Sequence, residues 1–218
     1  MNKLESKNIN LLIDFDSTFI KEESLELLST ISLKNIPNKD IIKKKISQIT
    51  TDAMEGNIKF SDALIKRIEL LKAHKNHLEI IINKIQKNIT KSFLSNKQFF
   101  NTNYKNCYII SGGFIELIYP VVKTFKIQKN NIFANQFLFD ESNNIISIDK
   151  KNPLSKDAGK VSIAKHIKGN NIIIGDGYTD YEVKKYGAAK RFIQFSGNID
   201  RKGLNPLADF IANDFNEI

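Results

Sequence analysis

Two aspartates, Asp14 and Asp16, close the apolar run 9–15 and are followed directly by Ser-Thr. Side chains alternate along a β-strand, so both carboxylates can face one cleft while Phe15 between them packs into the interior. One solvated aspartate at a strand exit is common, but a pair followed by hydroxyl residues is much rarer. The pentapeptide alone leaves a chemical role and a solvated loop as alternatives.

A second apolar run ends in the same way and delivers Asp176 into a turn between Gly175 and Gly177, with Asp180 four residues further on. The two glycines permit close backbone approaches that a side chain would forbid. If the two strand ends are neighbours, Asp14 and Asp176 can share one divalent cation. Magnesium suits them, because it takes oxygen ligands and also binds phosphate oxygens.

Anion-binding groups lie between these acidic motifs in the sequence. Ser111, Gly112 and Gly113 end a third apolar run and lead into a helix, where a hydroxyl and backbone N–H groups favour an anion. Lys160 follows a glycine turn and offers a fixed positive charge. Taken alone, the motif at residues 111–113 is better explained as a plain glycine turn, and Lys160 cannot be distinguished from the other lysines. Taken together with the aspartates, they predict a phosphoryl-transfer site with a carboxylate nucleophile and a magnesium ion.

The elements that must position these residues alternate short apolar runs with helical stretches, which predicts an α/β fold with a Rossmann-like parallel sheet flanked by helices. In such sheets ligands bind at the carboxyl ends of the strands. Residues 22–104 have helical periodicity and no convincing strand, so we expect a helical cap inserted after the first strand. The expected division is a core of residues 1–21 and 105–218 and a cap of residues 22–104. The expected strands are 9–15, 106–111, 131–135, 171–176 and 191–195, with a hairpin at 137–148.

Composition bounds the other possibilities. The net charge of +9 in 218 residues could indicate a nucleic-acid partner, but the excess is scattered lysine and only three residues are arginine. Cys107 is the only cysteine, so neither an intramolecular disulfide nor a cysteine zinc cluster can form. No run is long and apolar enough for a membrane helix or a signal peptide, which makes a cytoplasmic location the expectation. The oligomeric state is left open.

The motifs, in order, resemble those of the haloacid dehalogenase superfamily of phosphatases. The pattern DxDx[TV], Ser/Thr, Lys and GDxxxD is matched by Asp14 to Thr18, Ser111, Lys160, and Asp176 to Asp180. The resemblance implies that Asp14 attacks phosphorus to form an aspartyl-phosphate. It also implies that Asp16 is the general acid and base, and that Mg²⁺ is held by Asp14, the Asp16 carbonyl and Asp176, with Asp180 behind them.

Within the superfamily, the chain resembles the phosphoserine phosphatases. DFDSTFIKEES is similar to their first motif and places the substrate-binding glutamate at Glu23, while AMEGNIKFSDALIKRIELL is similar to their cap segment and places its Met, Phe and Arg at Met54, Phe60 and Arg67. Arg67 can pair bidentately with a carboxylate, and Glu23 can meet an ammonium group. Read without the resemblance, Arg67 is a solvated helix residue and Glu23 part of an acidic first turn.

The resemblance implies a Mg²⁺-dependent hydrolase of O-phosphoserine, acting in serine biosynthesis on a small-molecule phosphomonoester. The chain departs from its relatives at two positions, with Thr179 where many bacterial relatives carry Asn and Glu55 where some carry Gly. The resemblance therefore specifies the reaction more firmly than the substrate. Phosphothreonine, phosphoethanolamine and a sugar phosphate stay as alternative substrates, and a basic nucleic-acid-binding protein as an alternative class. The residues assigned to binding substrate and its phosphoryl oxygens are Thr18, Glu23, Met54, Phe60, Arg67, Ser111, Gly112, Gly113 and Thr179, with Lys160 as a catalytic clamp.

Overall fold

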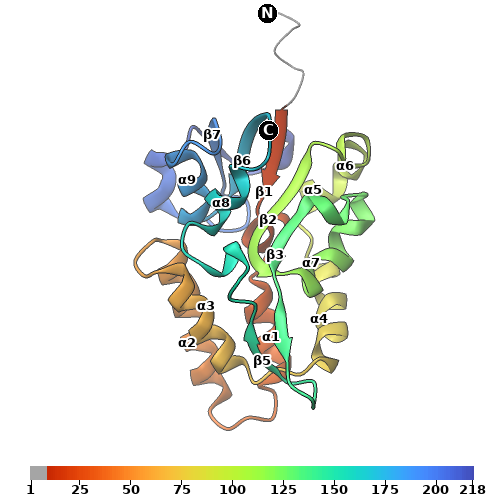
Figure 1. The fold of residues 1–218 in the computed structure, drawn as a ribbon, viewed down its shortest axis with the longest axis vertical. Coiled ribbons are helices and arrows are strands. Elements are labelled where there is room, and N and C mark those ends of the chain that lie inside the picture. Colours follow the sequence, from red (N-terminus) through yellow and green to blue (C-terminus); the bar gives the residue numbers. More distant parts are fainter. Residues whose placement is uncertain (1–8) are drawn as a thin grey trace, which may run out of the picture.

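The computed structural model describes residues 9–218 and is built on one six-stranded sheet in which every neighbouring pair is parallel. This sheet, flanked by helices, confirms the expected α/β fold, and the N-terminal strand lies near its middle (Figure 1). In sheet order the strands are β3 (Ile132–Asn135), β2 (Cys107–Phe114), β1 (Ile9–Ile13), β6 (Asn170–Gly175), β7 (Arg191–Phe195) and β8 (Phe210–Ala212).

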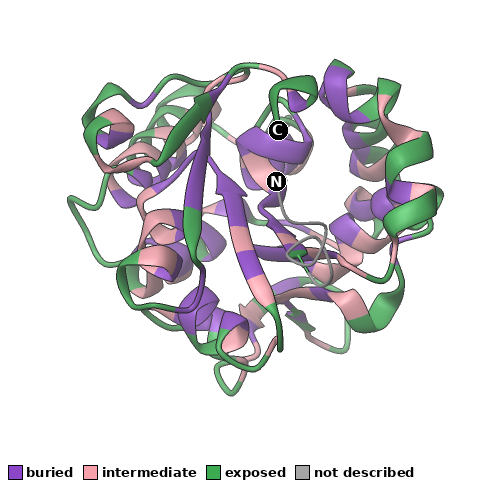
Figure 2. Ribbon diagram, turned by 90° about the horizontal axis from the view of Figure 1, so that it is seen from above, coloured by how far each residue is buried: buried purple, intermediate pink, exposed green. Residues whose placement is uncertain are grey.

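Alternation along the central strands divides the apolar core between the two faces of the sheet. Leu12 and Ile173 pack into a cluster with residues of α8 (Gly159–Ala164) and α9 (Tyr178–Lys185). Their neighbours Ile13 and Ile174 belong to the larger cluster, which includes α7 (Ile115–Val122). Because both faces are covered, the strands read as nearly continuous apolar runs, and Figure 2 shows them buried at the centre of the molecule.

Helices between β1 and β2 form most of a second layer at the carboxyl ends of the strands (Figure 1). Their apolar residues recur at helical spacing, as in α4, where Leu78, Ile81 and Ile85 are buried. A two-stranded antiparallel hairpin packs against α3 in this layer. The elements are α1 (Ser24–Ser32), α2 (Lys39–Met54), α3 (Phe60–Leu71), α4 (Asn76–Lys87), β4 (Phe137–Phe139) and β5 (Ile145–Ile148).

Two short helices, α5 (Lys91–Ser95) and α6 (Lys97–Asn103), return the chain to the sheet. Their phenylalanines Phe93 and Phe100 are fully buried and pack with Phe19, whose ring centroid lies 5.0 Å from that of Phe93. The segment expected to be helical therefore consists of helices joined by turns, with no strand between residues 22 and 104. The division of the chain into core and cap at residues 22 and 104 stays a prediction.

The expected strands and hairpin are present, with two differences. β2 continues beyond Ser111 to Phe114, because the glycines bulge within the strand instead of ending it. The short edge strand β8 was not expected, since three residues give too little periodicity to recognise. Cys107 is buried, which raises the pKa of its thiol to about 12. Among residues 9–218 no helix is long and apolar enough to cross a membrane.

Candidate active site

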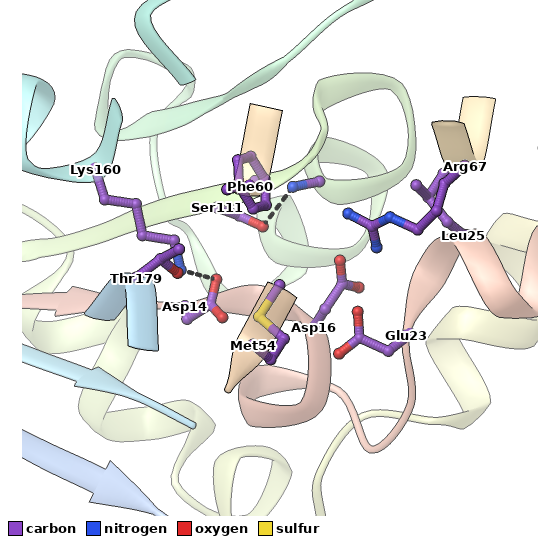
Figure 3. Close-up of a pocket in the computed structure, with 12 residues that line it drawn as sticks. Asp14, Asp16, Glu23, Leu25, Met54, Phe60, Arg67, Ser111, Lys160 and Thr179 are labelled. Carbon is purple, nitrogen blue, oxygen red and sulfur yellow. Dashed lines mark hydrogen bonds and ion pairs between the residues drawn. The ribbon is translucent and has the colours of Figure 1, made fainter. Parts of the chain in front are cut away.

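The acidic pair predicted to do chemistry lies at the carboxyl end of β1, where the chain leaves the strand in a wide turn over Phe15–Phe19. The turn closes through the N–H of Ile20, which donates to the carbonyl of Phe15 over 3.0 Å. Ser17 adopts a positive φ of 54°, so the turn is not a regular helix. This geometry brings the carboxylates of Asp14 and Asp16 into one pocket (Figure 3).

Lys160 holds the Asp14 carboxylate from the other side of the pocket and is itself paired with Asp180. Nζ of Lys160 lies 2.8 Å from Oδ1 of Asp14 and 2.8 Å from Oδ1 of Asp180. Burial opposes the charge on Lys160, but the two carboxylates outweigh it and raise the pKa of the ammonium group. Gly175 is required here, because a Cβ at that position would overlap the carboxylate of Asp180. Lys160 is thus a fixed, charged contact of Asp14.

Asp176 lies beside this group at the end of β6. Its Oδ2 accepts a hydrogen bond of 2.8 Å from Nε of Arg201, and its Oδ1 lies 3.4 Å from the hydroxyl of Thr18. Burial, opposed by Arg201, raises the pKa of Asp176 to about 7. Burial, opposed by Lys160, raises the pKa of Asp180 to about 8.

Three of these carboxylates fit a divalent cation. One oxygen each of Asp14, Asp176 and Asp180 lies within 4.8 Å of the others, and all three residues are buried. The raised pKa values of Asp176 and Asp180 show that negative charge is unfavourable at this place, and a cation would relieve it. An all-oxygen set of this kind suits Mg²⁺.

Asp16 points away from that cluster and is held by the first residue of α1. The backbone N–H and the hydroxyl of Ser24 donate to its two carboxylate oxygens over 2.9 and 3.0 Å. Burial and the negative charges of Glu23 and Asp14 nevertheless raise the pKa of Asp16 well above its usual range. A carboxyl group whose pKa is raised in this way is suited to general acid catalysis.

Helices of the second layer supply the opposite wall of the pocket (Figure 3). Arg67 on α3 is buried and donates from Nη1 to the Thr50 hydroxyl over 3.2 Å, while its Nε has no partner among residues 9–218. Burial lowers the pKa of Arg67, opposed by the charges of Glu23 and Asp16. Glu23 accepts a hydrogen bond of 2.8 Å from the Ser17 hydroxyl, and burial raises its pKa. Arg67 therefore lines the pocket near two acids, with its Nε unpaired among residues 9–218.

The remaining wall is formed where α3 meets β2. Ser111, Gly112 and Gly113 stand between the pairs Ile110–Phe133 and Phe114–Asn135 of the β2–β3 ladder, so three residues oppose one. Such a bulge pushes backbone out of the sheet. The N–H of Gly113 donates to the Ser111 hydroxyl over 3.0 Å.

Residues of α2 and α3 close the pocket above this bulge. The Phe60 ring packs directly on Gly112, and the Met54 sulfur lies against Gly177. The hydroxyl of Thr179 is buried and has no partner among the described residues. The pocket is therefore small, and Thr179 and Arg67, which line it, each carry an unpaired polar atom.

The phosphoserine phosphatase of Drosophila melanogaster is 30% identical to this chain over 211 residues, covering 94% of the chain and 74% of that relative. The chain belongs to the phosphoserine phosphatase family. The chloroplastic phosphoserine phosphatase of Arabidopsis thaliana is 29% identical over 210 residues and is covered to 68% of its length. No model of a known protein family matches the chain.

Solved structures agree with this family membership. A phosphoserine phosphohydrolase-like protein from Francisella tularensis superposes with a TM-score of 0.86 at 32% identity, over 95% of this chain and 96% of that one. A phospho-aspartyl intermediate analogue of phosphoserine phosphatase superposes with a TM-score of 0.77 at 23% identity, which supports the fold alone. The chain is a phosphoric monoester hydrolase of the haloacid dehalogenase superfamily, as the order of its motifs indicated.

In this member of the phosphoserine phosphatase family, the residues predicted from sequence converge on one place. All but three of them line the pocket itself. Asp176 and Asp180 lie beside Asp14 within the carboxylate cluster, and Thr18 lies next to Asp176.

Sequence reasoning missed several residues that hold the site of this family member. Ser24 binds Asp16, Arg201 binds Asp176, and Asn135 donates to the carbonyls of Gly112 and Leu154 over 2.9 and 3.1 Å. Arg201 could have been found, because it is one of three arginines in a lysine-rich chain. Ser24 and Asn135 carry no comparable signal.

Proposed function

We propose that this chain hydrolyses O-phosphoserine to serine and phosphate through an aspartyl-phosphate on Asp14, with Mg²⁺ as cofactor. The observation that carries the proposal is the buried Arg67, which lines the pocket and whose Nε has no partner among residues 9–218. A buried guanidinium needs an anionic partner. The carboxylate of an amino-acid substrate would supply it.

Asp14 is the proposed nucleophile. One carboxylate oxygen attacks phosphorus in line, the bond from phosphorus to the serine oxygen breaks, and a phosphoaspartate forms. Lys160, 2.8 Å from Oδ1 of Asp14, directs that carboxylate and adds positive charge where the phosphoryl group arrives. Water then attacks the phosphoaspartate, releases phosphate and restores the Asp14 carboxylate.

Asp16 is the proposed proton donor and acceptor. Its raised pKa keeps it protonated before the first step, so it can protonate the leaving serine oxygen. It is then ionised and can take a proton from the water that attacks in the second step. The two hydrogen bonds from Ser24 fix the carboxyl group in position for both transfers.

The metal ligands in this proposal are Asp14, the backbone carbonyl of Asp16 and Asp176, with Asp180 behind them. When bound, Mg²⁺ neutralises charge on the phosphoryl oxygens and on the surrounding carboxylates. The chain itself prepares the place. Arg201 orients Asp176, and Lys160 holds Asp180.

The rest of the pocket is proposed to read the substrate. Arg67 binds the carboxylate and Glu23 the ammonium group, while Met54 and Phe60 cover the bound molecule and exclude water. The groups proposed to hold phosphoryl oxygens are Thr18, Ser111, Gly112, Gly113 and Thr179. With residues 22–104 as a cap on a core of 1–21 and 105–218, specificity would come mainly from the cap. Serine biosynthesis and a cytoplasmic location follow as predictions from this activity.

A phosphate-release panel tests the proposal. Phosphoserine, phosphothreonine, phosphoethanolamine and a sugar phosphate are compared with and without magnesium, and phosphoserine should lead by at least about tenfold. Asp14→Asn should retain less than about a hundredth of wild-type turnover, whereas Asp40→Asn on the exposed face of α2 should be unchanged. Turnover of Asp14→Asn above that level contradicts the assigned nucleophile.

Arg67→Ala separates phosphoserine from substrates that lack a carboxylate. We expect KM for phosphoserine to rise at least about thirtyfold and KM for phosphoethanolamine to change little. Lys66→Ala, on the exposed side of the same helix, is the matched control. An equal rise for both substrates would mean that Arg67 supports the pocket without binding the carboxylate.

A further inference from the structure

A side chain from outside the predicted motifs closes the turn that carries the acidic pair. Asn198 lies in the loop after β7, and its side-chain nitrogen Nδ2 lies 3.2 Å from the carbonyl oxygen of Ser17, 3.0 Å from that of Thr18 and 3.2 Å from that of Ile20. A carboxamide nitrogen has two hydrogens, so it shares them among these three carbonyls and the hydroxyl of Thr90. One amide group therefore gathers the carbonyls of the turn.

Thr90 completes this arrangement from the segment before α5. Its hydroxyl lies 2.7 Å from Nδ2 of Asn198 and donates to the carbonyl of Thr18 over 2.8 Å. The backbone N–H of Thr90 donates to the carbonyl of Phe19 over 3.0 Å. Two segments far away in the sequence, around residues 90 and 198, are thus joined to the turn over Phe15–Phe19.

The turn needs such support for two reasons. Ser17 has a positive φ, which costs free energy in a residue with a side chain. Three carbonyl groups also converge on one place, where they repel one another unless a donor lies between them. The hydrogen bond within the turn does not supply such a donor, because the N–H of Ile20 bonds to the carbonyl of Phe15 and not to any of these three carbonyls.

We propose that Asn198 is a positioning residue for the reaction, which sets the turn so that Asp16 can reach the leaving-group oxygen while Asp14 attacks phosphorus. This inference rests on the proposed function, in which Asp16 is the general acid. Asn198 does not line the pocket and acts only through the backbone of the turn. The same loop brings Arg201 to Asp176, so one loop supports both acidic strand ends.

Replacing Asn198 should therefore harm proton transfer more than binding. Asn198→Asp is nearly isosteric but turns an oxygen toward three carbonyl oxygens, and Asn198→Ala leaves them without a donor. For phosphoserine we expect kcat/KM to fall at least about thirtyfold in both variants, with KM within about threefold of wild type, because small displacements of catalytic groups are costly. A space-filling role instead predicts that Asn198→Asp is nearly normal.

The test compares phosphoserine with acetyl phosphate, whose acetate leaving group does not need a proton. The ratio kcat/KM reports formation of the phosphoaspartate, so a misplaced Asp16 should lower it at least about tenfold more for phosphoserine than for acetyl phosphate. A merely structural role lowers both substrates by the same factor, since it reduces only the folded fraction. Asn213→Ala, at an exposed asparagine that bonds Ser196 instead, is the control and should match wild type.

Thr90→Val gives an independent variant if the Asn198 proteins do not fold. It keeps the shape of the side chain and removes the hydroxyl bonded to Asn198 and Thr18, and we expect the same selective loss at about three- to tenfold. Equal losses for the two substrates overturn the inference about Asn198. Failure of the wild-type protein to hydrolyse phosphoserine would overturn the proposed function, which is a separate outcome.

Discussion

Nζ of Lys160 lies 2.8 Å from Oδ1 of Asp14, with both side chains buried at the junction of α8 and the end of β1. A buried ammonium group and a buried carboxylate each lose hydration, and the loss is offset only when charges and hydrogen bonds are matched. Asp180 provides the second match at 2.8 Å. Asp14, the proposed nucleophile, is therefore part of a three-residue charge cluster in which Lys160 pairs with two acids.

Lys160→Met should leave Asp14 and Asp180 as buried carboxylates without their shared cation. We expect kcat to fall by at least about a hundredfold, because stabilisation of the phosphoryl charge is lost and the two acids compete for a proton. Steady-state phosphate release measures the effect. Lys165→Met, at an exposed position shortly after α8, is the control and should keep full activity. A Lys160→Met enzyme within tenfold of wild type would contradict a role for this lysine in the first step.

The raised pKa values of Asp176 and Asp180, about 7 and about 8, predict a pH-dependent response to magnesium. An acid whose pKa is higher in the folded state contributes stability at low pH, and this contribution is lost as pH rises through the folded pKa. The metal-free protein should therefore lose thermal stability between about pH 6 and about pH 8. Mg²⁺ competes with those protons, so its stabilising effect should grow over the same range.

Thermal unfolding with and without millimolar MgCl₂ measures this linkage. The increase in melting temperature caused by Mg²⁺ should be larger at about pH 8 than at about pH 6. Asp176→Asn should show a smaller increase that depends less on pH. An increase that is equal at both pH values in the wild-type protein would mean that proton release does not accompany metal binding.

Arg201 should control how tightly Asp176 takes part in metal binding. Arg201→Met removes the hydrogen bond of 2.8 Å to Oδ2 of Asp176 and leaves the pKa of that carboxyl without its main opposing charge. Groups that orient metal ligands typically contribute about 10- to 100-fold in affinity or activity. We expect the magnesium concentration for half-maximal activity to rise about tenfold or more. Arg191→Met, at an exposed position on β7, is the control, and an unchanged magnesium requirement in Arg201→Met would contradict the assignment.

The side chains proposed to react are easier to predict from the sequence than the side chains that position them. Asp14, Ser111 and Asp176 follow apolar runs, and a parallel sheet brings such strand ends to one edge whatever the loops do. Arg201 and Asn198 lie in a loop whose path depends on tertiary packing, so spacing along the chain does not place them near Asp14. The sequence predicted a turn at the glycines of β2, where the structure has a bulge. The pairing of β2 with β3 shows that the strand continues, and this pairing cannot be read from the spacing of residues along the chain. Short edge strand β8 gives no periodicity to detect.

The contact between Gly112 of β2 and Phe60 of α3 provides a last test of how these two elements pack. A methyl group at Gly112 would overlap the tip of the Phe60 ring, so Gly112→Ala must displace either the ring or the start of α3. Since α3 also carries Arg67, we expect KM for phosphoserine to rise at least about tenfold.

A second substitution at Phe60 shows whether this contact is the cause. Phe60→Ala alone should also raise KM, because the pocket loses its cover, but the Gly112→Ala/Phe60→Ala double variant should be less impaired than the product of the two single effects. Gly203→Ala, where an added methyl group meets no atom within 4 Å, is the matched control and should behave as wild type. Fully multiplicative effects in the double variant would show that the ring and the glycine act independently, and that Gly112 is needed for its backbone contacts with the phosphoryl group instead.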